Sequence, residues 1–462
     1  MQMVTVGPVT EELAARFTAA GHRLYLVGGS VRDALLGRDV SDLDFTTDAR
    51  PDAVQAIVDG WADAVWDTGI AFGTIGARRR GTTVEITTFR ADAYDRVSRN
   101  PVVRFGDTIE DDLVRRDFTV NAMAVELTGP ERRFVDPHGG LAALAAGVLD
   151  TPATPEESFA DDPLRMLRAA RFVSQLGLTP AERVVVAMTE MAGELARITR
   201  ERVQAELSKL MLGTHPRRGI ELMVDTGLCE LVLPEVPAMR LAIDEHMQHK
   251  DVYTHSLVVM EQAIERETDG PDLVLRLAAL LHDIGKPDTR RKEPDGRVSF
   301  HHHEVVGAKM TRRRLRELRY SKQIVDDVAQ LVFLHLRFHG YSGGEWTDSA
   351  VRRYVTDAAR CWSGCTSSCA RTAPPATGAG PPRSSAATTP SRSGSPACAS
   401  RRRSTPSGPT WTATRSCGCW ASPRVRRSAR PTSTCWPCGW NAVRCPARRP
   451  RPSCGAGPPS SS

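Results

Sequence analysis

The chain has 462 residues, 41% of them hydrophobic, which is enough for two to four domains with packed cores. No stretch approaches the roughly 20 apolar residues that cross a bilayer, and the N-terminus lacks the pattern of a secretory signal, so we expect a cytoplasmic protein. The formal net charge of +6 hides an acidic part, because residues 1–360 hold 46 basic against 55 acidic side chains. A generally basic surface is therefore excluded there, and RNA binding would have to come from local Arg clusters.

The first 150 residues mix helical and strand patterns. A helix is expected at residues 11–20, and a strand at 23–27 runs into a Gly-Gly turn that is followed by a second helix from Val31. Alternation predicts further strands at 43–47 and 82–89. This mixture predicts an α/β head with a small mixed sheet over residues 1–150.

From Ser158 onward the strand signals fade and apolar residues recur with the helical period. The expected helices are 164–176, 202–211, 220–228, 256–264 and 273–282. Pro234 and Pro237 mark a boundary. We therefore predict an all-helical neck at residues 151–237 and a His-rich helical domain at 238–360.

Residues 361–462 have a different composition. They contain fifteen Arg and ten of the eleven Cys, but no Leu, Ile, Phe, Met, Lys, Asp or Glu, so no core can form. We interpret this segment as an unstructured tail that a frameshift near Arg360 produces, with weakened RNA affinity as its consequence. A metal knuckle at Cys417, Cys419, Cys435 and Cys438 is an alternative, although its spacing is not that of structural zinc sites. The single Cys before the tail excludes a disulfide framework in the folded part.

The first group of candidate site residues follows the Gly-Gly turn. Gly29 lets the backbone approach a phosphate, and the guanidinium of Arg32 can fork onto phosphate oxygens. Asp42 and Asp44 lie two residues apart on a predicted strand, which directs both carboxylates to one face. Paired carboxylates of this kind hold Mg²⁺. Glu85 is the candidate third carboxylate, and a cross-strand ion pair is the alternative for it.

A second group lies on the helix that begins near Asp162. Arg165, Arg168 and Arg171 are spaced by three, which predicts a cationic edge opposite a buried face. An exposed helix with salt bridges is the alternative, but the alternation of Glu and Lys that such a helix shows is missing.

These residues resemble the signature of the bacterial-type CCA-adding tRNA nucleotidyltransferase and poly(A) polymerase family, within the polymerase-β-like superfamily. The matching segments are residues 26–33 with Asp42-x-Asp44, residues 115–122, residues 161–165, and Glu201-Arg202-x-x-x-Glu206. The resemblance implies that Gly29 and Arg32 contact the incoming nucleotide, that Asp42 and Asp44 bind Mg²⁺, and that Arg116 reaches the triphosphate.

The resemblance also implies how the base is read. Asp162 and Arg165 occupy the positions that hydrogen-bond the base edge, and a carboxylate accepts from the exocyclic amine that ATP and CTP possess and UTP lacks. Arg168 and Arg171 would meet phosphates. The expected reaction is addition of CMP and AMP to the 3′ end of tRNA, with poly(A) addition as the closest alternative.

Histidines recur in the second helical domain. Their spacing around the pair His282-Asp283 resembles the HD phosphohydrolase superfamily, which implies a second divalent metal. The expected ligands are His255, His282 and Asp283, with His303 and Asp348 as weaker candidates because His301, His302, Asp326 and Asp327 compete for those roles. A metal-dependent phosphohydrolase that uses the head only to bind nucleotides, and a non-catalytic RNA-binding protein, are the alternatives from other classes.

Overall fold

The computed structural model describes residues 6–38, 42–90, 105–241, 251–296 and 298–336. Within these ranges, none of the helices combines the length and the apolar character that crossing a membrane requires. The predicted tail and the helix expected after Val351 lie outside the described residues.

A mixed seven-stranded sheet forms the head. Its strands are β1 (Leu24–Val27), β2 (Asp42–Thr47), β3 (Ala64–Trp66), β4 (Thr74–Arg79), β5 (Thr82–Thr88), β6 (Ala124–Glu126) and β7 (Phe134–Val135), in the order β3-β4-β5-β2-β1-β6-β7. The pairing of β2 with β5 is parallel and the other neighbours are antiparallel. The helices are α1 (Pro8–Ala19), α2 (Gly29–Leu35), α3 (Pro51–Val58), α4 (Ile109–Val114) and α5 (Gly140–Ala146), with the 3₁₀ turns η1 (Ile70–Phe72) and η2 (Thr119–Asn121).

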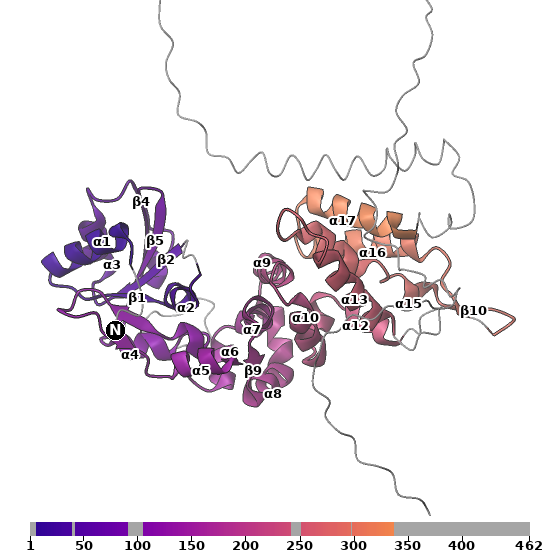
Figure 1. Ribbon diagram of the computed structural model, residues 1–462, viewed down its shortest axis with the longest axis horizontal. Coiled ribbons are helices and arrows are strands. Elements are labelled where there is room, and N and C mark those ends of the chain that lie inside the picture. The colour runs from indigo at the N-terminus through magenta and orange to yellow at the C-terminus, as the bar shows by residue number, and fades with distance from the viewer. Residues whose placement is uncertain (1–5, 39–41, 91–104, 242–250, 297, 337–462) are drawn as a thin grey trace, which may run out of the picture. The chain divides into compact units, whose positions relative to one another are not determined.

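The two faces of this sheet have different environments. Leu26, Phe45 and Ile86 face a core that also contains Leu13 of α1 and Val54 of α3, and Figure 1 shows these two helices together beside the strands. The opposite face carries Tyr25 and Val27, which pack with Ile109 and Leu113 of α4. Because side chains alternate along a strand, the polar positions between Leu43, Phe45 and Thr47 belong to this second face.

Helices make up most of the remaining chain. The neck contains α6 (Pro155–Asp161), α7 (Leu164–Leu176), α8 (Glu182–Met191), η3 (Ala192–Arg197), α9 (Arg200–Met211), α10 (Pro216–Asp225), α11 (Leu228–Val232), α12 (Glu235–Ala238) and η4 (Met239–Leu241). The His-rich part contains α13 (Val252–Ile264), α14 (Leu273–Leu281), α15 (Lys286–Thr289), α16 (His303–Glu317) and α17 (Lys322–Leu334), of which α16 and α17 lie side by side (Figure 1).

Local sequence explains where many helices begin. The side chains of Thr108, Thr154, Asp251, Asp272 and Ser321 each accept a hydrogen bond from a backbone N–H in the first turn of the helix that follows. The expected head fold is confirmed, and so are four of the five expected helices, with α7 at the expected residues 164–176. The helix expected at 220–228 begins earlier and ends at Asp225, because a turn at Thr226 and Gly227 separates α10 from α11.

The all-helical expectation needs one correction. The structure adds two-residue strands, namely β8 (Val148–Leu149) paired with β9 (Thr179–Pro180), and β10 (Arg291–Lys292) paired with β11 (Val298–Ser299). Pairs this short contain no alternation for a sequence pattern to reveal. One buried cluster runs from Phe118 to Val332 without a break at Pro237, so the proposed domain boundaries stay predictions.

Candidate functional site

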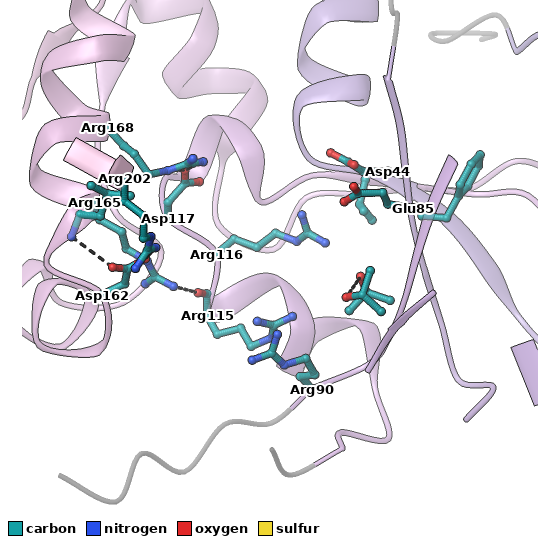
Figure 2. A pocket seen from close by; sticks show the side chains of 15 residues that line it. Asp44, Glu85, Arg90, Arg115, Arg116, Asp117, Asp162, Arg165, Arg168 and Arg202 are labelled. Atoms are coloured by element: carbon teal, nitrogen blue, oxygen red, sulfur yellow. Dashed lines mark hydrogen bonds and ion pairs between the residues drawn. The ribbon is translucent and has the colours of Figure 1, made fainter. Parts of the chain in front are cut away.

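A polar cleft of about 360 Å³ lies between the sheet and the first neck helices. Figure 2 shows carboxylates on the sheet side and arginines approaching from the other side. The lining residues come from β1, β2, β4, β5 and the start of α7, together with the loop after α4 and Arg202 of α9. Separate parts of the sequence therefore supply its two walls.

The sheet wall carries the carboxylates. Asp44 on β2 is directly opposite Glu85 on the parallel strand β5, and both line the cleft. Residues opposite each other on neighbouring strands share a face, so these two side chains leave the sheet on the side away from α1 and α3. Position 42 is two residues earlier on the same strand, opposite Thr83, but the side chain of Asp42 lies outside the described part.

The expected ion pair of Glu85 is not formed within the described residues. Its side chain is exposed, and the cross-strand neighbours Asp44 and Gly76 offer no positive charge. Carboxylate oxygens are the donors that Mg²⁺ prefers, so Asp44 and Glu85 fit a divalent cation at this wall. Their roles as ligands remain predictions.

At Gly28, Arg116 of the arginine wall and Asp44 of the carboxylate wall both come close to the backbone. Its φ is +69°, which favours glycine, and a Cβ at this position would lie 2.9 Å from Nη1 of Arg116 and 3.8 Å from Oδ2 of Asp44. A Cβ on Gly29, the glycine singled out from the sequence, would instead meet the side chain of Arg32 at 3.5 Å. From the sequence, both glycines of the turn can let the backbone approach a phosphate, and only Gly29 was assigned a nucleotide contact, because adjacent glycines look alike until the turn is built.

Asp112 on α4 orients two arginines of the cleft. Its Oδ1 accepts from Nη2 of Arg115 at 2.7 Å, and its Oδ2 accepts from Nη2 of Arg116 at 2.9 Å. Burial alone would raise the pKa of this fully buried carboxyl, but the two guanidinium groups outweigh burial and hold the pKa below its ordinary value. Asp112 therefore stays ionised and holds Arg116 on the sheet side of the cleft.

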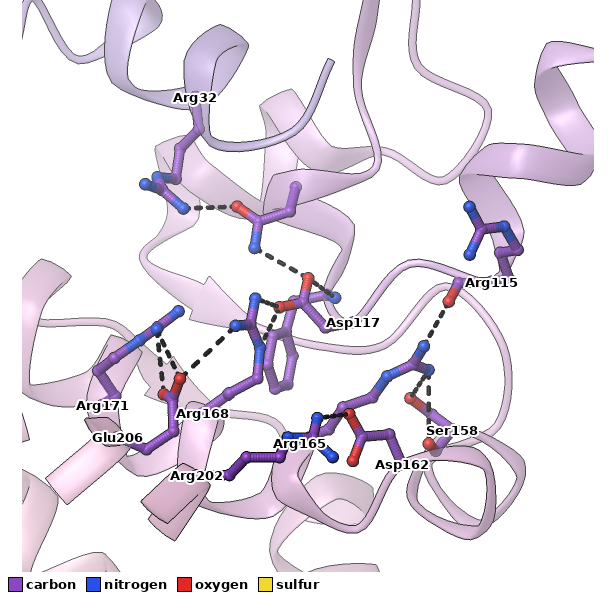
Figure 3. A network of polar contacts seen from close by, with 12 residues as sticks. Arg32, Arg115, Asp117, Ser158, Asp162, Arg165, Arg168, Arg171, Arg202 and Glu206 are labelled. Carbon is purple, nitrogen blue, oxygen red and sulfur yellow. Dashed lines mark hydrogen bonds and ion pairs between the residues drawn. The ribbon is translucent and has the colours of Figure 1, made fainter. Parts of the chain in front are cut away.

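Asp117 links α7 to the head. Its Oδ2 accepts from Nε of Arg168 at 2.9 Å and from Nη2 of the same residue, while its Oδ1 accepts from Nδ2 of Asn121 at 2.9 Å. Asn121 in turn accepts from Nη1 of Arg32 at 2.5 Å (Figure 3). Burial opposes the charge on Asp117, but Arg168 outweighs burial and lowers the pKa far below its usual range.

This network determines where Arg32 lies. The guanidinium of Arg32 is mostly buried, also donates to Asp33, and is absent from the cleft lining. In the structure it therefore braces α2 against Asn121, and the expected contact with a nucleotide stays a prediction.

The neck wall carries the expected base-reading pair. Oδ2 of Asp162 accepts from Nη2 of Arg202 at 2.8 Å, and Oδ1 accepts from the backbone N–H of Leu164 at 3.2 Å. Arg165 donates through Nη1 to Oγ of Ser158 at 2.8 Å and through Nη2 to the carbonyl of Arg115 at 2.7 Å. Both side chains line the cleft, each fixed by contacts outside its own helix.

Arg171 departs from the expected cationic edge. Its guanidinium is buried and donates through Nη1 to Oε1 of Glu206 on α9 at 3.1 Å, and Oε2 of the same carboxylate lies 3.0 Å away. Burial and the neighbouring charge of Arg168 lower the pKa of Arg171 to about 10, so it remains charged at neutral pH. Because Arg171 does not line the cleft, its observed role is to join α7 to α9, and the expected phosphate contact finds no support in this arrangement.

Among the expected residues, the cleft thus contains Asp44, Glu85, Arg116, Asp162, Arg165 and Arg168. The sequence analysis did not single out Arg90, Arg115, Asp117 and Arg202 as cleft residues, although all four line it. Arg115, Asp117 and Arg202 stood inside quoted motifs, and that signal could have identified them.

A second cluster surrounds Asp283, directly after α14. Nε2 of His282 lies 3.0 Å from Oδ2 of Asp283, and Nε2 of His303 lies 3.2 Å from Oδ1. His335, at the end of α17, is 3.6 Å from Oδ1 through its Nε2, and His255 of α13 is 3.8 Å from Oδ2. Two groups of candidate metal ligands result, each within 4.8 Å: His255 with His282 and Asp283, and Asp283 with His303 and His335.

The three buried imidazoles have the same orientation. Each Nδ1 faces the carbonyl oxygen three residues earlier, at 2.8 Å for His282, 2.8 Å for His303 and 2.6 Å for His335. A carbonyl only accepts, so each Nδ1 donates to it, and each Nε2 is directed toward Asp283. Imidazole nitrogens that converge on a carboxylate are a donor set that fits a divalent metal.

Burial reinforces this charge arrangement. Burial opposes the ionisation of Asp283, but His282 and the other surrounding imidazoles outweigh it and hold the pKa well below the ordinary value. Nζ of Lys286 adds a further cation, 3.0 Å from Oδ2.

The backbone brings these ligands together at Gly285. A Cβ there would lie 2.3 Å from the carbonyl oxygen of His303 and 2.7 Å from the backbone nitrogen of Gly307, so only glycine lets α16 approach Asp283 this closely. His303 is thus distinguished from His301 and His302, whose side chains are 74% and 82% exposed.

Two expected details of this cluster differ from the structure. His335 was not among the ligands expected from the sequence, although it lies beside Asp283. Asp348 lies outside the described residues, so its role stays a prediction, as does the cytoplasmic location.

Three protein-family models match the chain in the same order as these sites. "Poly A polymerase head domain" matches residues 24–150, "Probable RNA and SrmB- binding site of polymerase A" matches residues 177–239, and "HD domain" matches residues 252–361. Proteins with such head and HD domains usually use divalent metals.

The relatives agree with these matches. The A-adding tRNA nucleotidyltransferase of Deinococcus radiodurans is 38% identical over 324 residues, covering 67% of this chain and 68% of that protein. The CCA-adding enzyme of Geobacillus sp. (strain WCH70) is 40% identical over 209 residues, which is 45% of this chain and 50% of that protein. The chain therefore spans about half the length of that relative.

A solved structure extends the similarity to the fold. The crystal structure of the Bacillus stearothermophilus CCA-adding enzyme in complex with CTP superimposes with a TM-score of 0.53 at 27% identity, covering 80% of both chains. Similar domains in the same order, and a relative matched over two thirds of its length, show that the chain belongs to the tRNA nucleotidyltransferase and poly(A) polymerase family.

Proposed function

We propose that the chain adds CMP and AMP to the 3′ end of tRNA, taking them from CTP and ATP and releasing pyrophosphate. The observation that supports this most directly is the cleft itself. Asp44 and Glu85 on one wall face Arg116, and Asp162 and Arg165 form the other wall of the same cavity. This cavity of about 360 Å³ therefore contains side chains that match a triphosphate, a metal ion and the edge of a base.

The reaction forms a bond between the 3′ oxygen of the RNA and the α-phosphorus, and breaks the bond from that phosphorus to the pyrophosphate oxygen. Mg²⁺ bound at Asp42 and Asp44 would supply activation of the hydroxyl and neutralisation of the leaving group. Arg116, held by Asp112, would bind the triphosphate, and Glu85 would complete the carboxylate set. Since these groups are prearranged, the chain contributes mainly positioning and electrostatic stabilisation.

Base selection would rest on the neck wall. Asp162 already accepts two hydrogen bonds, and a carboxylate has about four acceptor sites, so it can also accept from the amine of cytosine or adenine. Uracil presents a carbonyl at that position, and two acceptors would then face each other. Arg202 fixes the carboxylate of Asp162, and Ser158 fixes Arg165, so neither group needs to reorganise when a base binds.

The test is incorporation of labelled nucleotides into a tRNA that lacks its CCA end. CTP alone should add CMP, CTP with ATP should complete the end, and UTP should add nothing. Failure to incorporate CMP with a tRNA that the protein binds would overturn CCA addition.

Addition of A alone is the second possibility for this cleft, because the relative that covers the largest share of the chain among those described is an A-adding enzyme. A tRNA ending in CC separates the two, since an A-adding protein extends it with ATP but ignores CTP on the shorter tRNA. Poly(A) addition would instead give a long ladder of products with ATP alone.

A metal-dependent phosphohydrolase activity is a further candidate, in the HD part of the chain. The observation that favours it is the convergence of three imidazole Nε2 atoms on the buried carboxylate of Asp283. Two overlapping ligand groups share that carboxylate, and paired metals of this kind hydrolyse phosphoesters. Hydrolysis of a model phosphodiester that Asp283→Asn abolishes and Asp44→Asn spares would support it.

A further inference from the structure

The solvent-facing side of α16 carries four cations. Lys309, Arg312, Arg313 and Arg316 are spaced by three and four residues, so they lie on one face of the helix. The opposite face is buried through His303, Gly307, Ala308, Thr311 and Leu315. We call these four residues the α16 stripe.

No acidic side chain neutralises the α16 stripe within the described part of the protein. None of its four members forms an ion pair there, whereas the neighbouring Arg314 pairs with Glu235 at 3.0 Å and with Glu317 at 2.8 Å. Glu304 lies in the first turn, on another side of the helix. The contrast with Arg314 shows that α16 pairs its inward-turned arginine and leaves the outward cations unpaired.

Folding alone does not favour this arrangement. The stripe contains like charges at every i,i+3 and i,i+4 spacing between its members, and such pairs destabilise a helix. A solvated helix face would normally alternate Glu with Lys or Arg. Residues 1–360 carry more acidic than basic side chains, so four adjacent cations also stand out from the surrounding charge.

The helix that carries the stripe has one end at the Asp283 cluster and the other beside α9. At the start of α16, His303 belongs to the Asp283 cluster. Just beyond its end, Nε of Arg319 lies 3.7 Å from Oε1 of Glu201, and the hydroxyls of Ser208 and Tyr320 are 3.1 Å apart. Glu201 precedes Arg202, which lines the nucleotide cleft. A helix of this length spans about 22 Å. The four cations of the stripe therefore extend along α16, away from the end that lies beside α9.

We propose that the α16 stripe binds the phosphate backbone of the RNA whose 3′ end enters the cleft. This rests on the proposed function, because it assigns to that RNA a second contact region. Charge complementarity identifies the occupant as a polyanion. The segment after Arg360 cannot take this place, since it contains fifteen Arg and no acidic residue.

Binding of tRNA as a function of salt tests this proposal. In the full chain, Lys309, Arg312, Arg313 and Arg316 are each replaced by Gln, and dissociation constants are measured by fluorescence anisotropy over a series of NaCl concentrations. We expect at least a tenfold loss of affinity at 0.1 M salt, and a slope of log K against log salt that becomes shallower by about 3, since each phosphate contact contributes roughly 0.9.

The matched control replaces four exposed cations away from the stripe, Arg266, Arg290, Arg291 and Lys292, with the same change in net charge. An equal loss in the control would overturn the proposal, because net charge would then suffice. Unchanged affinity and slope in the stripe variant would also overturn it.

Failure of the stripe proposal can be distinguished from failure of the proposed function. CMP incorporation by the unaltered chain with a saturating short RNA primer reports on the cleft alone. A stripe variant with normal incorporation there and weak tRNA binding supports the stripe. An unaltered chain that binds tRNA but adds nothing contradicts the proposed function instead.

Discussion

The nucleotide cleft and the Asp283 cluster are both built from charged side chains, but in opposite ways. In the cleft, Arg168 and Arg202 retain 31% and 51% of their side-chain exposure. In the cluster, His282, Asp283 and His335 retain 4%, 3% and 4%. The first site is open to a large polar ligand, whereas most groups of the second are shielded from solvent and His255, with 38% exposure, is its most accessible member.

The difference shows how each site keeps its geometry. In the cleft, the buried carboxylates of Asp112 and Asp117 orient the arginines: Asp112 pairs with Arg115 and Arg116, and Asp117 pairs with Arg168. The cluster is held from within, because backbone carbonyls anchor three imidazoles through Nδ1 and the Nε2 atoms converge on Asp283. A charged group of the cleft can be hydrated when its partner changes, whereas an unpaired charge in the buried cluster would cost free energy.

The comparison predicts that the two activities separate completely. Asp44→Asn should lower nucleotide addition by about three orders of magnitude, since it removes several kcal/mol of charge stabilisation and each 1.36 kcal/mol is tenfold. The rate at saturating CTP is the measurement. Metal bound at the Asp283 cluster should not change, and a loss there would show that the sites are coupled.

Asp283→Asn is the converse change. It removes the carboxylate that both ligand groups share, so we expect the dissociation constant for Mn²⁺ in this part of the chain to rise by at least a hundredfold. Isothermal titration would measure it, with His301→Ala, at an exposed neighbour, as the control. Nucleotide addition should stay within a factor of two of the unaltered rate, and a larger drop would contradict independent sites.

Asp112→Asn tests whether the buried carboxylate of Asp112 orients the arginines of the cleft. Without the carboxylate, Arg115 and Arg116 lose the partner that orients them, so the KM for CTP should rise by about 10- to 100-fold, with a smaller change in kcat. Binding of pyrophosphate should weaken in parallel while binding of cytidine, which lacks phosphates, stays unchanged. Equal weakening of cytidine would indicate general damage to the fold, and Asp112→Glu should recover part of the phosphate affinity.

The same carboxyl predicts a pH dependence of stability. The folded pKa of Asp112 lies below the ordinary value of about 3.9, so its stabilisation is present above that pH and is lost as the pH falls through the folded pKa. Thermal unfolding between pH 6 and pH 3 should therefore show a smaller decline for Asp112→Asn than for the unaltered chain. An equal decline would mean that the pair contributes little.

Gly28→Ala should have the smallest effect. The added Cβ would come within 2.9 Å of Arg116 Nη1 at a backbone conformation with φ of +69°, which costs on the order of 1 kcal/mol in strain. The KM for CTP should rise by about five- to tenfold while the Asp283 cluster keeps its metal affinity. Gly29→Ala is the comparison, because the Cβ there meets only the side chain of Arg32 at 3.5 Å.

Local patterns in the sequence were sufficient for several features of this fold. The periodicity of residues 164–176 identified α7, and the alternation around Asp44 and around Val84 identified the two strands whose carboxylates face each other. The His-Asp pair after an apolar run identified the centre of the cluster at which two groups of candidate metal ligands meet. Each of these signals lies within a few residues, where the period of a helix or a strand determines which side chains share a face.

Other features were decided only by tertiary contacts. No local pattern shows that Asp112 is buried behind Arg115 and Arg116, that Arg171 is turned inward onto Glu206, or that His335 completes the cluster with His303, 32 residues earlier. The motifs alone identified the family. Which cation faces a ligand and which one is used in packing depends on the elements that meet it, because burial and the nearest opposite charge, rather than residue type, determine where a long side chain lies.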